Sequence, residues 1–118
     1  MEPLRYDLRL RLFRAQKFFG PGVAELLHGV DNRGSIRAAC REMGMAYSKA
    51  WKILNRAEQD LGFALLSREA GGSGGGNAVL TPEGKAFLRR YDAFVHAVQQ
   101  QADRLYDEYF GDMEDTGA

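Results

Sequence analysis

Apolar and charged residues alternate at the start of the chain. Leu4, Tyr6, Leu8, Leu10 and Leu12 occupy every second position, and charged side chains, three of them arginines, separate them. Successive side chains of a β-strand point to opposite faces, so this period of two predicts a half-buried strand with a charged outer face. Outward charges also protect a strand edge from unwanted pairing. We therefore expect an N-terminal strand over residues 4–12.

The apolar period changes to that of a helix after Gly20-Pro21-Gly22. Proline suits the first turn of a helix, so this tripeptide ends the strand pattern and can begin a helix. Four apolar residues then fall at i, i+3, i+4 and i+7 and form one helical stripe: Val23, Leu26, Leu27 and Val30. The turn-forming residues 31–34 are expected to end this helix.

Two shorter helices joined by a tight turn are predicted next. Ser35 can cap the first by accepting a hydrogen bond from a backbone N–H, and Gly44 suits a left-handed C-cap. The inner face of this helix is expected to contain Ile36, Ala39, Cys40 and Met43. The second helix is predicted over residues 47–60, with helically spaced apolar residues at Ala50, Ile53, Leu54, Ala57 and Leu61. Residues 35–61 therefore form a predicted helix-turn-helix.

The outer side of the second helix is polar and basic, and its two acids lie only at the C-terminal end. Its outer residues are Tyr47, Ser48, Lys49, Lys52, Asn55, Arg56 and Gln59. Cations near a helix N-terminus oppose the helix dipole, and a bound phosphate would reverse that penalty. Such side chains contact base edges and phosphates in a major groove, so we interpret this as a recognition helix, with a solvated face as the alternative. Trp51 is expected to pack against the helix pair rather than to bind.

A β-hairpin with a glycine-rich tip is predicted after the helix-turn-helix. Residues 65–68 and 78–80 are the expected strands, and residues 71–77 between them are only Gly, Ser and Asn. A phosphate-binding P-loop requires a Lys and then Ser or Thr after its last glycine and leads into a helix, so nucleotide binding is not expected. A hairpin in this place is typical of a wing, here residues 64–80, whose glycines let the backbone approach DNA. A plain flexible loop is the alternative.

A long helix is predicted over residues 81–110, because Thr81 can cap it and Pro82 suits its first position. Apolar residues recur at spacings of three and four along it and are the predicted dimerisation residues: Leu88, Tyr91, Val95, Val98, Ala102, Leu105 and Tyr109. We expect the helix to pack on the N-terminal strand and first helix, and its distal half to supply a coiled-coil-like dimer contact. Packing within one chain alone is the alternative. Fraying is expected from Asp107 onwards, into an acidic tail over residues 111–118.

The charge is distributed unevenly although the 118 residues sum to a net charge of zero. Residues 33–90 carry ten Lys and Arg against five acids, a local charge of +5, whereas residues 91–118 carry one Arg against seven acids, a local charge of −6. Local potential rather than net charge steers a polyanion. A basic centre and an acidic end are thus consistent with nucleic-acid binding through the centre alone.

Several classes of protein are excluded or disfavoured by the composition. The apolar runs are far shorter than the roughly 20 residues that span a bilayer, and no signal-peptide core is present, so we expect a cytoplasmic protein without a membrane partner. One cysteine and two distant histidines cannot form a metal site, so neither a metal nor another cofactor is expected. His28 and His96 have no acid placed to orient them, and Cys40 is interpreted as core, so an enzyme is not expected.

A series of short motifs runs from the helix-turn-helix to the start of the long helix: Gly34-Ser35-Ile36, Met43-Gly44, Tyr47, Ala50-Trp51, Leu61, Arg68, the glycine-rich tip and Leu80-Thr81-Pro82-Glu83-Gly84. This series resembles the N-terminal domain of the ModE family of bacterial molybdate-responsive transcriptional regulators, over about residues 5–110. Leu61-Gly62 and Leu80-Thr81-x-x-Gly84 are also similar to LysR-type regulators. The resemblance implies a winged-helix DNA-binding homodimer, joined through the first strand and the long last helix.

Three departures from that family pattern change what we expect. ModE regulators continue into a molybdate-binding portion that these residues do not include, so molybdate binding is not expected from this chain alone. The position that caps the recognition helix is usually Ser or Thr and is Ala46 here, at a cost of about 1 kcal/mol to helix stability. The wing of the family tends to carry a Lys among its glycines, whereas this chain has Ser73.

The sequence therefore predicts a mainly α fold with a small β component. It is expected to form one winged helix-turn-helix domain over residues 1–118, with a long C-terminal dimerisation helix. The expected function is sequence-specific binding of double-stranded DNA by a homodimeric transcriptional regulator. The alternative is a winged-helix module for protein interaction or dimerisation with little affinity for DNA. The predicted DNA-binding residues are Ser35, Arg37, Tyr47, Ser48, Lys49, Lys52, Asn55, Arg56, Arg68 and Ser73.

Overall fold

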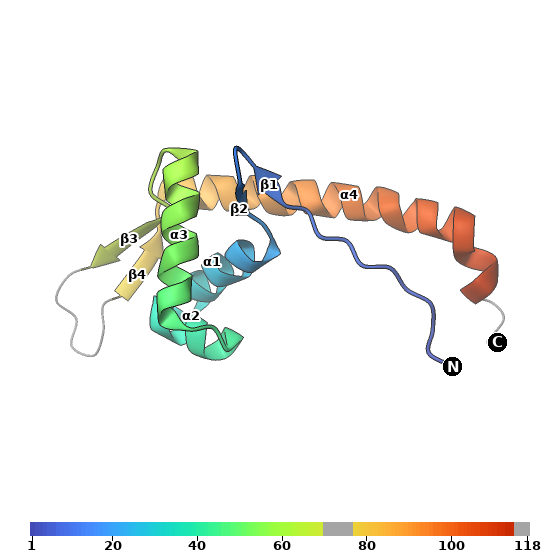
Figure 1. Cartoon of the computed structure of the whole chain (residues 1–118), viewed down its shortest axis with the longest axis horizontal. Coiled ribbons are helices and arrows are strands. Elements are labelled where there is room, and N and C mark those ends of the chain that lie inside the picture. Colours follow the sequence, from blue (N-terminus) through green and yellow to red (C-terminus); the bar gives the residue numbers. More distant parts are fainter. Residues whose placement is uncertain (70–76, 115–118) are drawn as a thin grey trace.

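Residues 1–69 and 77–114 are described by the computed structural model, and within them the chain is mainly helical with two small antiparallel sheets (Figure 1). The elements are β1 (Leu12–Phe13), β2 (Lys17–Phe19), α1 (Pro21–Arg33), α2 (Ile36–Met43), α3 (Tyr47–Leu61), β3 (Leu66–Glu69), β4 (Asn77–Leu80) and α4 (Pro82–Glu114). The predicted fold class and the order of the helix-turn-helix, wing strands and long helix are confirmed.

Local capping groups define most of the helix boundaries as predicted. The Ser35 hydroxyl accepts a hydrogen bond from the backbone N–H of Ala38 at 3.1 Å. Thr81 accepts one from the backbone N–H of Gly84 at 2.9 Å, with Pro82 as the first helical residue. Gly44 has a φ of 68°, in the left-handed region that residues with a Cβ rarely adopt, and ends α2.

The core lies where α1, α2 and α3 meet β2, the wing strands and the start of α4. Its largest fully buried side chains are Phe19, Leu26, Leu27, Val30, Leu54 and Leu65. The predicted apolar stripe of α1 is buried throughout. A Cβ at Gly29 would lie 2.9 Å from the Cβ of Ala39, so these two small residues allow α1 and α2 to approach closely.

The last helix divides into a packed half and a projecting half. Leu88 and Tyr91 are 4% and 5% exposed and belong to the core, and Val95 packs against it. Beyond them α4 extends away from the body of the molecule (Figure 1). The expectation of fraying from Asp107 is wrong, because α4 continues to Glu114. The remaining acidic tail, residues 115–118, lies outside the described residues.

The N-terminal segment is extended, but the prediction of a strand over residues 4–12 is wrong except at its end, where Leu12 enters β1. The predicted alternation is seen in the exposure of the side chains. Tyr6, Leu8, Leu10 and Leu12 are half-buried, whereas the charged residues between them are exposed. The carbonyl oxygens of Leu4 and Leu10 accept hydrogen bonds from tyrosines of α4, not from a neighbouring strand. The period of two therefore indicates which side of the segment faces the protein, but it does not identify the element against which the segment packs.

A short hairpin between this segment and α1 is absent from the sequence-based prediction. β1 and β2 pair antiparallel around a turn in which the Arg14 N–H donates to the Gln16 carbonyl at 3.1 Å. The strands have two and three residues, too few to show a period. Buried Phe18 and Phe19 anchor the hairpin, and the Phe19 ring packs edge-on against Phe87 and Tyr91 of α4.

Candidate nucleic-acid interface

The recognition helix, α3, presents a continuous polar and basic face to solvent. Its exposed residues include six of the seven assigned to its outer side: Ser48, Lys49, Lys52, Asn55, Arg56 and Gln59. Tyr47 is half-buried, and Ala50, Leu54 and Ala57 are buried on the opposite side. The predicted orientation of the helix is therefore confirmed, and Lys49, Lys52 and Asn55 are accessible to a ligand.

The N-terminal end of α3 carries no capping side chain and no acid. Ala46 occupies the N-cap with extended backbone angles, and no side chain accepts from the first turn. The first backbone N–H groups of a helix lack intrahelical acceptors and carry the positive end of its dipole. With Lys49 and Lys52 in the first two turns, this end of the helix suits an anion such as a backbone phosphate.

Two arginines from outside α3 stack on its aromatic residues. The Arg37 guanidinium of α2 lies 4.3 Å from the ring centroid of Tyr47, and the Arg68 guanidinium of β3 lies 3.9 Å from that of Trp51. Tyr47 and Trp51 are themselves edge to face, with centroids 6.2 Å apart. Arg37, Tyr47, Trp51 and Arg68 thus form a cation–aromatic strip that joins α2, α3 and the wing. Packing of Trp51 is confirmed, and Arg68 covers it.

The wing strands pair as the predicted hairpin. β3 and β4 pair antiparallel, with Arg68 opposite Ala78 and Leu66 opposite Leu80. Ala78 and Leu80 are buried against the core, and Arg68, directly opposite Ala78, shares that face of the hairpin and contacts Trp51 of α3 from it. Ser73, a predicted DNA-binding residue, lies outside the described residues.

Both acids of α3 are half-buried, and the Glu58 carboxylate binds backbone groups of the protein. The Glu58 carboxylate accepts from the backbone N–H groups of Leu65 and Leu66, at 2.7 and 3.3 Å, and fixes the start of β3. The backbone carbonyl oxygen of Asp60 accepts a hydrogen bond from Arg14 Nε at 2.7 Å. Arg56, a predicted phosphate ligand, donates from Nη1 to the Gln16 side chain of the β1–β2 turn. One of its nitrogens therefore binds the hairpin.

The remaining predicted DNA contacts lie on α2. Ser35 is the N-cap, so its hydroxyl is already bonded to the Ala38 N–H and would meet DNA only from its free side. Arg37 is exposed and reaches α3 through Tyr47. The structure therefore brings Arg37, Arg68 and the α3 residues to one connected region.

The residues assigned to a dimer contact do not form one exposed stripe. Leu88 and Tyr91 are buried in the chain's own core and are not available to a second copy, which corrects their assignment. Val95, Val98 and Ala102 are half-buried. Leu105 and Tyr109 are 50% and 72% exposed, and Phe94, Phe110 and Met113 are exposed with them. An exposed apolar patch on the distal half of α4 remains.

One sequence-based statement about the histidines is wrong. His28 Nε2 lies 2.7 Å from Asp92 Oδ2, so α1 and α4 are linked by a pair separated by 64 residues. Both side chains are about half exposed and no nucleophile is paired with them. Cys40 is buried, and burial raises the pKa of its thiol while Arg37 opposes that shift.

Residues 1–69 and 77–114 contain neither a metal-ligand cluster nor a helix suited to span a membrane. Their His, Cys, Asp and Glu side chains form no group of three or more that could hold a metal ion. In that part of the chain, no helix combines the length and the apolar character needed to cross a membrane.

Comparison with known proteins finds similarity over most of the chain. The profile of the bacterial regulatory helix-turn-helix proteins of the lysR family matches residues 24–85. Over 106 residues, 89% of the chain, it is 33% identical to the DNA-binding transcriptional dual regulator ModE of Escherichia coli K12. It is 38% identical over 73 residues, 62% of the chain, to the molybdenum-pterin-binding protein MopB of Rhodobacter capsulatus. The chain spans only 40% and 27% of these relatives.

Solved structures share the fold at lower identity. The DNA-binding domain of CbnR in complex with DNA has a TM-score of 0.60 and 23% identity, covering 75% of this chain and 95% of that one. Full-length CbnR with its target DNA has a TM-score of 0.59 and 22% identity, covering 73% of this chain and 28% of that one. At this level of identity the likeness supports the fold alone.

Proposed function

The chain belongs to the lysR family of bacterial regulatory helix-turn-helix proteins, and we propose that it binds double-stranded DNA in the cytoplasm as a transcriptional regulator. The observation that carries the proposal is the outer face of α3. Its cations and amides are exposed and its acids face the scaffold. A relative at 33% identity is described as a DNA-binding transcriptional regulator, which is consistent with this use of the same elements.

In the proposed complex the N-terminal half of α3 enters the major groove. Tyr47, Ser48 and Lys49 lie nearest the bases, and Asn55 follows about two turns later along the same helix. Lys52 and the free nitrogens of Arg56 contact phosphates. Ser35 and Arg37 hold the backbone beside α2, and Arg68 does so beside the wing. Base contacts supply specificity and phosphate contacts supply position.

We further propose that two copies associate through the exposed distal half of α4. Leu105, Tyr109 and Phe110 are large apolar side chains left open to water on one projecting helix. Apolar patches of this kind on a soluble protein mark sites of association. A two-fold dimer would read two half-sites about one helical turn, or a multiple of it, apart.

The DNA-binding proposal is tested by fluorescence anisotropy. A labelled duplex from upstream of the chain's own gene is compared with a scrambled duplex at several salt concentrations. Lys52→Ala should weaken binding to both duplexes and flatten the salt slope by about 1, because one phosphate contact is lost. Ser48→Ala should mainly reduce the preference for the native duplex. Absence of binding by the wild type at low salt would refute the proposal.

The dimer is tested separately by sedimentation equilibrium. Leu105→Glu places a charge in the apolar patch and should shift the protein towards monomer, whereas Gln100→Glu adds the same charge at an exposed polar position and should not. A wild-type monomer at micromolar concentration would refute the α4 contact. Binding of a different protein there, together with no affinity for DNA, would instead identify an interaction module.

A further inference from the structure

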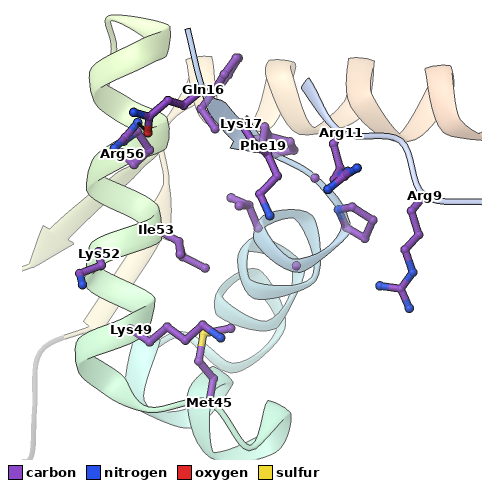
Figure 2. Close-up of a pocket in the computed structure, with 15 residues that line it drawn as sticks. Arg9, Arg11, Gln16, Lys17, Phe19, Met45, Lys49, Lys52, Ile53 and Arg56 are labelled. Atoms are coloured by element: carbon purple, nitrogen blue, oxygen red, sulfur yellow. Dashed lines mark hydrogen bonds between the residues drawn. The ribbon is translucent and has the colours of Figure 1, made fainter. Parts of the chain in front are cut away.

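A groove lies between α3 and the β1–β2 hairpin (Figure 2). The hairpin lies on the side of the recognition helix away from the wing strands (Figure 1). Its volume is about 700 Å³ and it is open to solvent along one side. The start of α1 and the buried rings of Phe18 and Phe19 contribute to its lining. Ile53 and Met45 line it from the helix-turn-helix. The groove therefore borders the same helix that carries the proposed DNA-binding face.

The charged residues that line this groove are all cations. There are six of them and, among the described residues of the lining, no Asp or Glu: Arg9, Arg11, Lys17, Lys49, Lys52 and Arg56. Of these, only Arg9 has an ion pair within residues 1–69 and 77–114, with Asp7 at 3.0 Å. Six like charges around one hollow repel one another, and an anion in the groove would relieve that repulsion.

The first turn of α1 adds a second feature that suits an anion. Gly20, Pro21 and Gly22 line the groove, the N-cap has no capping side chain, and no acid lies in the first turn. Pro21 has no N–H, so the groups of this turn without intrahelical acceptors are the N–H groups of Gly22 and Val23, two residues that line the groove with Arg11 and Lys17 at the positive end of the helix dipole. The cations and the helix end come from elements far apart in sequence and are brought together only by the fold.

The hairpin is held in place against α3 by side-chain contacts. Arg14 donates to the Asp60 carbonyl at 2.7 Å, and Arg56 donates to Gln16. Figure 2 shows the hairpin side with Lys17 and Arg11 facing the α3 side with Lys49 and Arg56 across the groove. The two walls of the groove are thus held together before any ligand binds, which lowers the ordering cost of binding.

We propose that this groove seats the sugar–phosphate backbone of one DNA strand, so that Arg11 and Lys17 extend the phosphate contacts beyond the helix-turn-helix and wing. The inference rests on the proposed function, because it requires α3 to enter the major groove. A strand of the duplex runs along each side of a helix lying in that groove. Arg68 and the wing flank α3 on one side, and the cationic groove flanks it on the other.

The occupant follows from where the groove lies. Three of its six cations, Lys49, Lys52 and Arg56, belong to the exposed face of α3, so an anion bound there is continuous with any duplex bound to that face. A linear polyanion can meet Arg11, Lys17 and Lys49 in succession, whereas a small anion would reach only part of the wall.

The test is the salt dependence of DNA binding in the full chain with both Arg11 and Lys17 replaced by Ala. Each phosphate contact contributes about 0.9 to the slope of log K against log salt, so the slope should fall by roughly 2. Affinity at about 0.1 M salt should fall roughly tenfold to a hundredfold, equally for native and scrambled duplexes. The matched control is Arg5→Ala with Arg89→Ala, which removes the same charge from exposed positions outside the groove and should leave the slope unchanged.

The outcomes separate this inference from the function on which it rests. If the wild type binds DNA and Lys52→Ala flattens the slope, but the Arg11 and Lys17 double variant keeps the wild-type slope, the groove is not a backbone seat. A loss restricted to the native duplex would also overturn the inference, because phosphate contacts carry no sequence information. Failure of the wild type to bind any duplex would refute the proposed function itself.

Discussion

Gly84 provides a test in which helix propensity and the folded structure predict opposite signs. It lies in the first turns of α4, where replacing Gly by Ala is ordinarily worth about 1 kcal/mol of stabilisation. A Cβ at this position would lie 2.4 Å from the backbone carbonyl oxygen of Leu65 and 3.0 Å from Thr81 Oγ1. The Leu65 oxygen already accepts the Thr81 N–H at 3.0 Å, and Thr81 caps the helix. Gly84→Ala therefore forces the wing strand away from the start of α4.

The magnitude follows from these contacts. Overpacking at a well-packed site costs about 1–3 kcal/mol. Weakening the hydrogen bond between Leu65 and Thr81 adds about 0.5–1.5 kcal/mol. After subtraction of the helix-propensity gain, the net effect is a loss of about 2 kcal/mol in the free energy of unfolding.

The measurement is urea unfolding followed by circular dichroism, at one fixed protein concentration because association would shift the midpoint. Gly22→Ala is the control: it lies in the first turn of α1, and a Cβ there would meet nothing within 4 Å. It should be neutral or stabilising by up to about 1 kcal/mol. A Gly84→Ala protein as stable as the wild type would refute the account of the junction between β3 and α4.

Three further predictions concern a cap, the core and the N-terminal segment. Ala46→Ser supplies the missing N-cap of α3 and should raise the free energy of unfolding by about 1 kcal/mol in the same urea assay; no change would mean that the first turn is already satisfied. Leu54→Ala removes a side chain that is 1% exposed and should cost about 2–5 kcal/mol, with a smaller loss for Leu54→Met as the size-matched control. The hydrogen bond from Tyr6 to Asp103 raises the pKa of Tyr6 to about 12, so Tyr6 should give a late ionisation in an ultraviolet absorbance titration; burial also raises the pKa of Tyr91. Because the folded pKa lies above the unfolded value of 10.0, this contact stabilises the segment below pH 10 and is lost as the pH rises through about 12. Asp103→Asn should move the late ionisation back towards 10, and an unchanged titration would contradict the docking of residues 1–11 on α4.

Features controlled by near neighbours in the sequence could be predicted. Ser35, Gly44 and Thr81 act on backbone groups within four residues, so residue type and position were sufficient. The helical spacing of Val23, Leu26, Leu27 and Val30 likewise determined which side of α1 is buried.

Features that depend on distant partners could not be predicted. The N-terminal alternation correctly indicated an extended, half-buried segment, but its partner is a helix some 80 to 100 residues away rather than a strand. Three contacts arise from tertiary packing and have no local signal in the sequence. They are the pairing of His28 with Asp92, the stacking of Arg68 on Trp51 and the hydrogen bonds from the start of β3 to Glu58. Arg9 and Arg11 were interpreted only as charges that protect a strand edge, because nothing local in the sequence indicates that they line a groove together with residues of α3.

The length of α4 has a mechanical consequence for the DNA that a dimer could read. From Tyr91, the last core residue, to Glu114 the helix runs for roughly 35 Å at 1.5 Å per residue. In an antiparallel pairing of two such helices, sliding the contact by one turn of about 5.4 Å on each copy would change the separation of the two α3 helices by about 11 Å. That is about a third of the distance between half-sites one helical turn apart. Operator spacing would then be encoded in the distal helix, and substitutions far from any base could retune which sites are occupied.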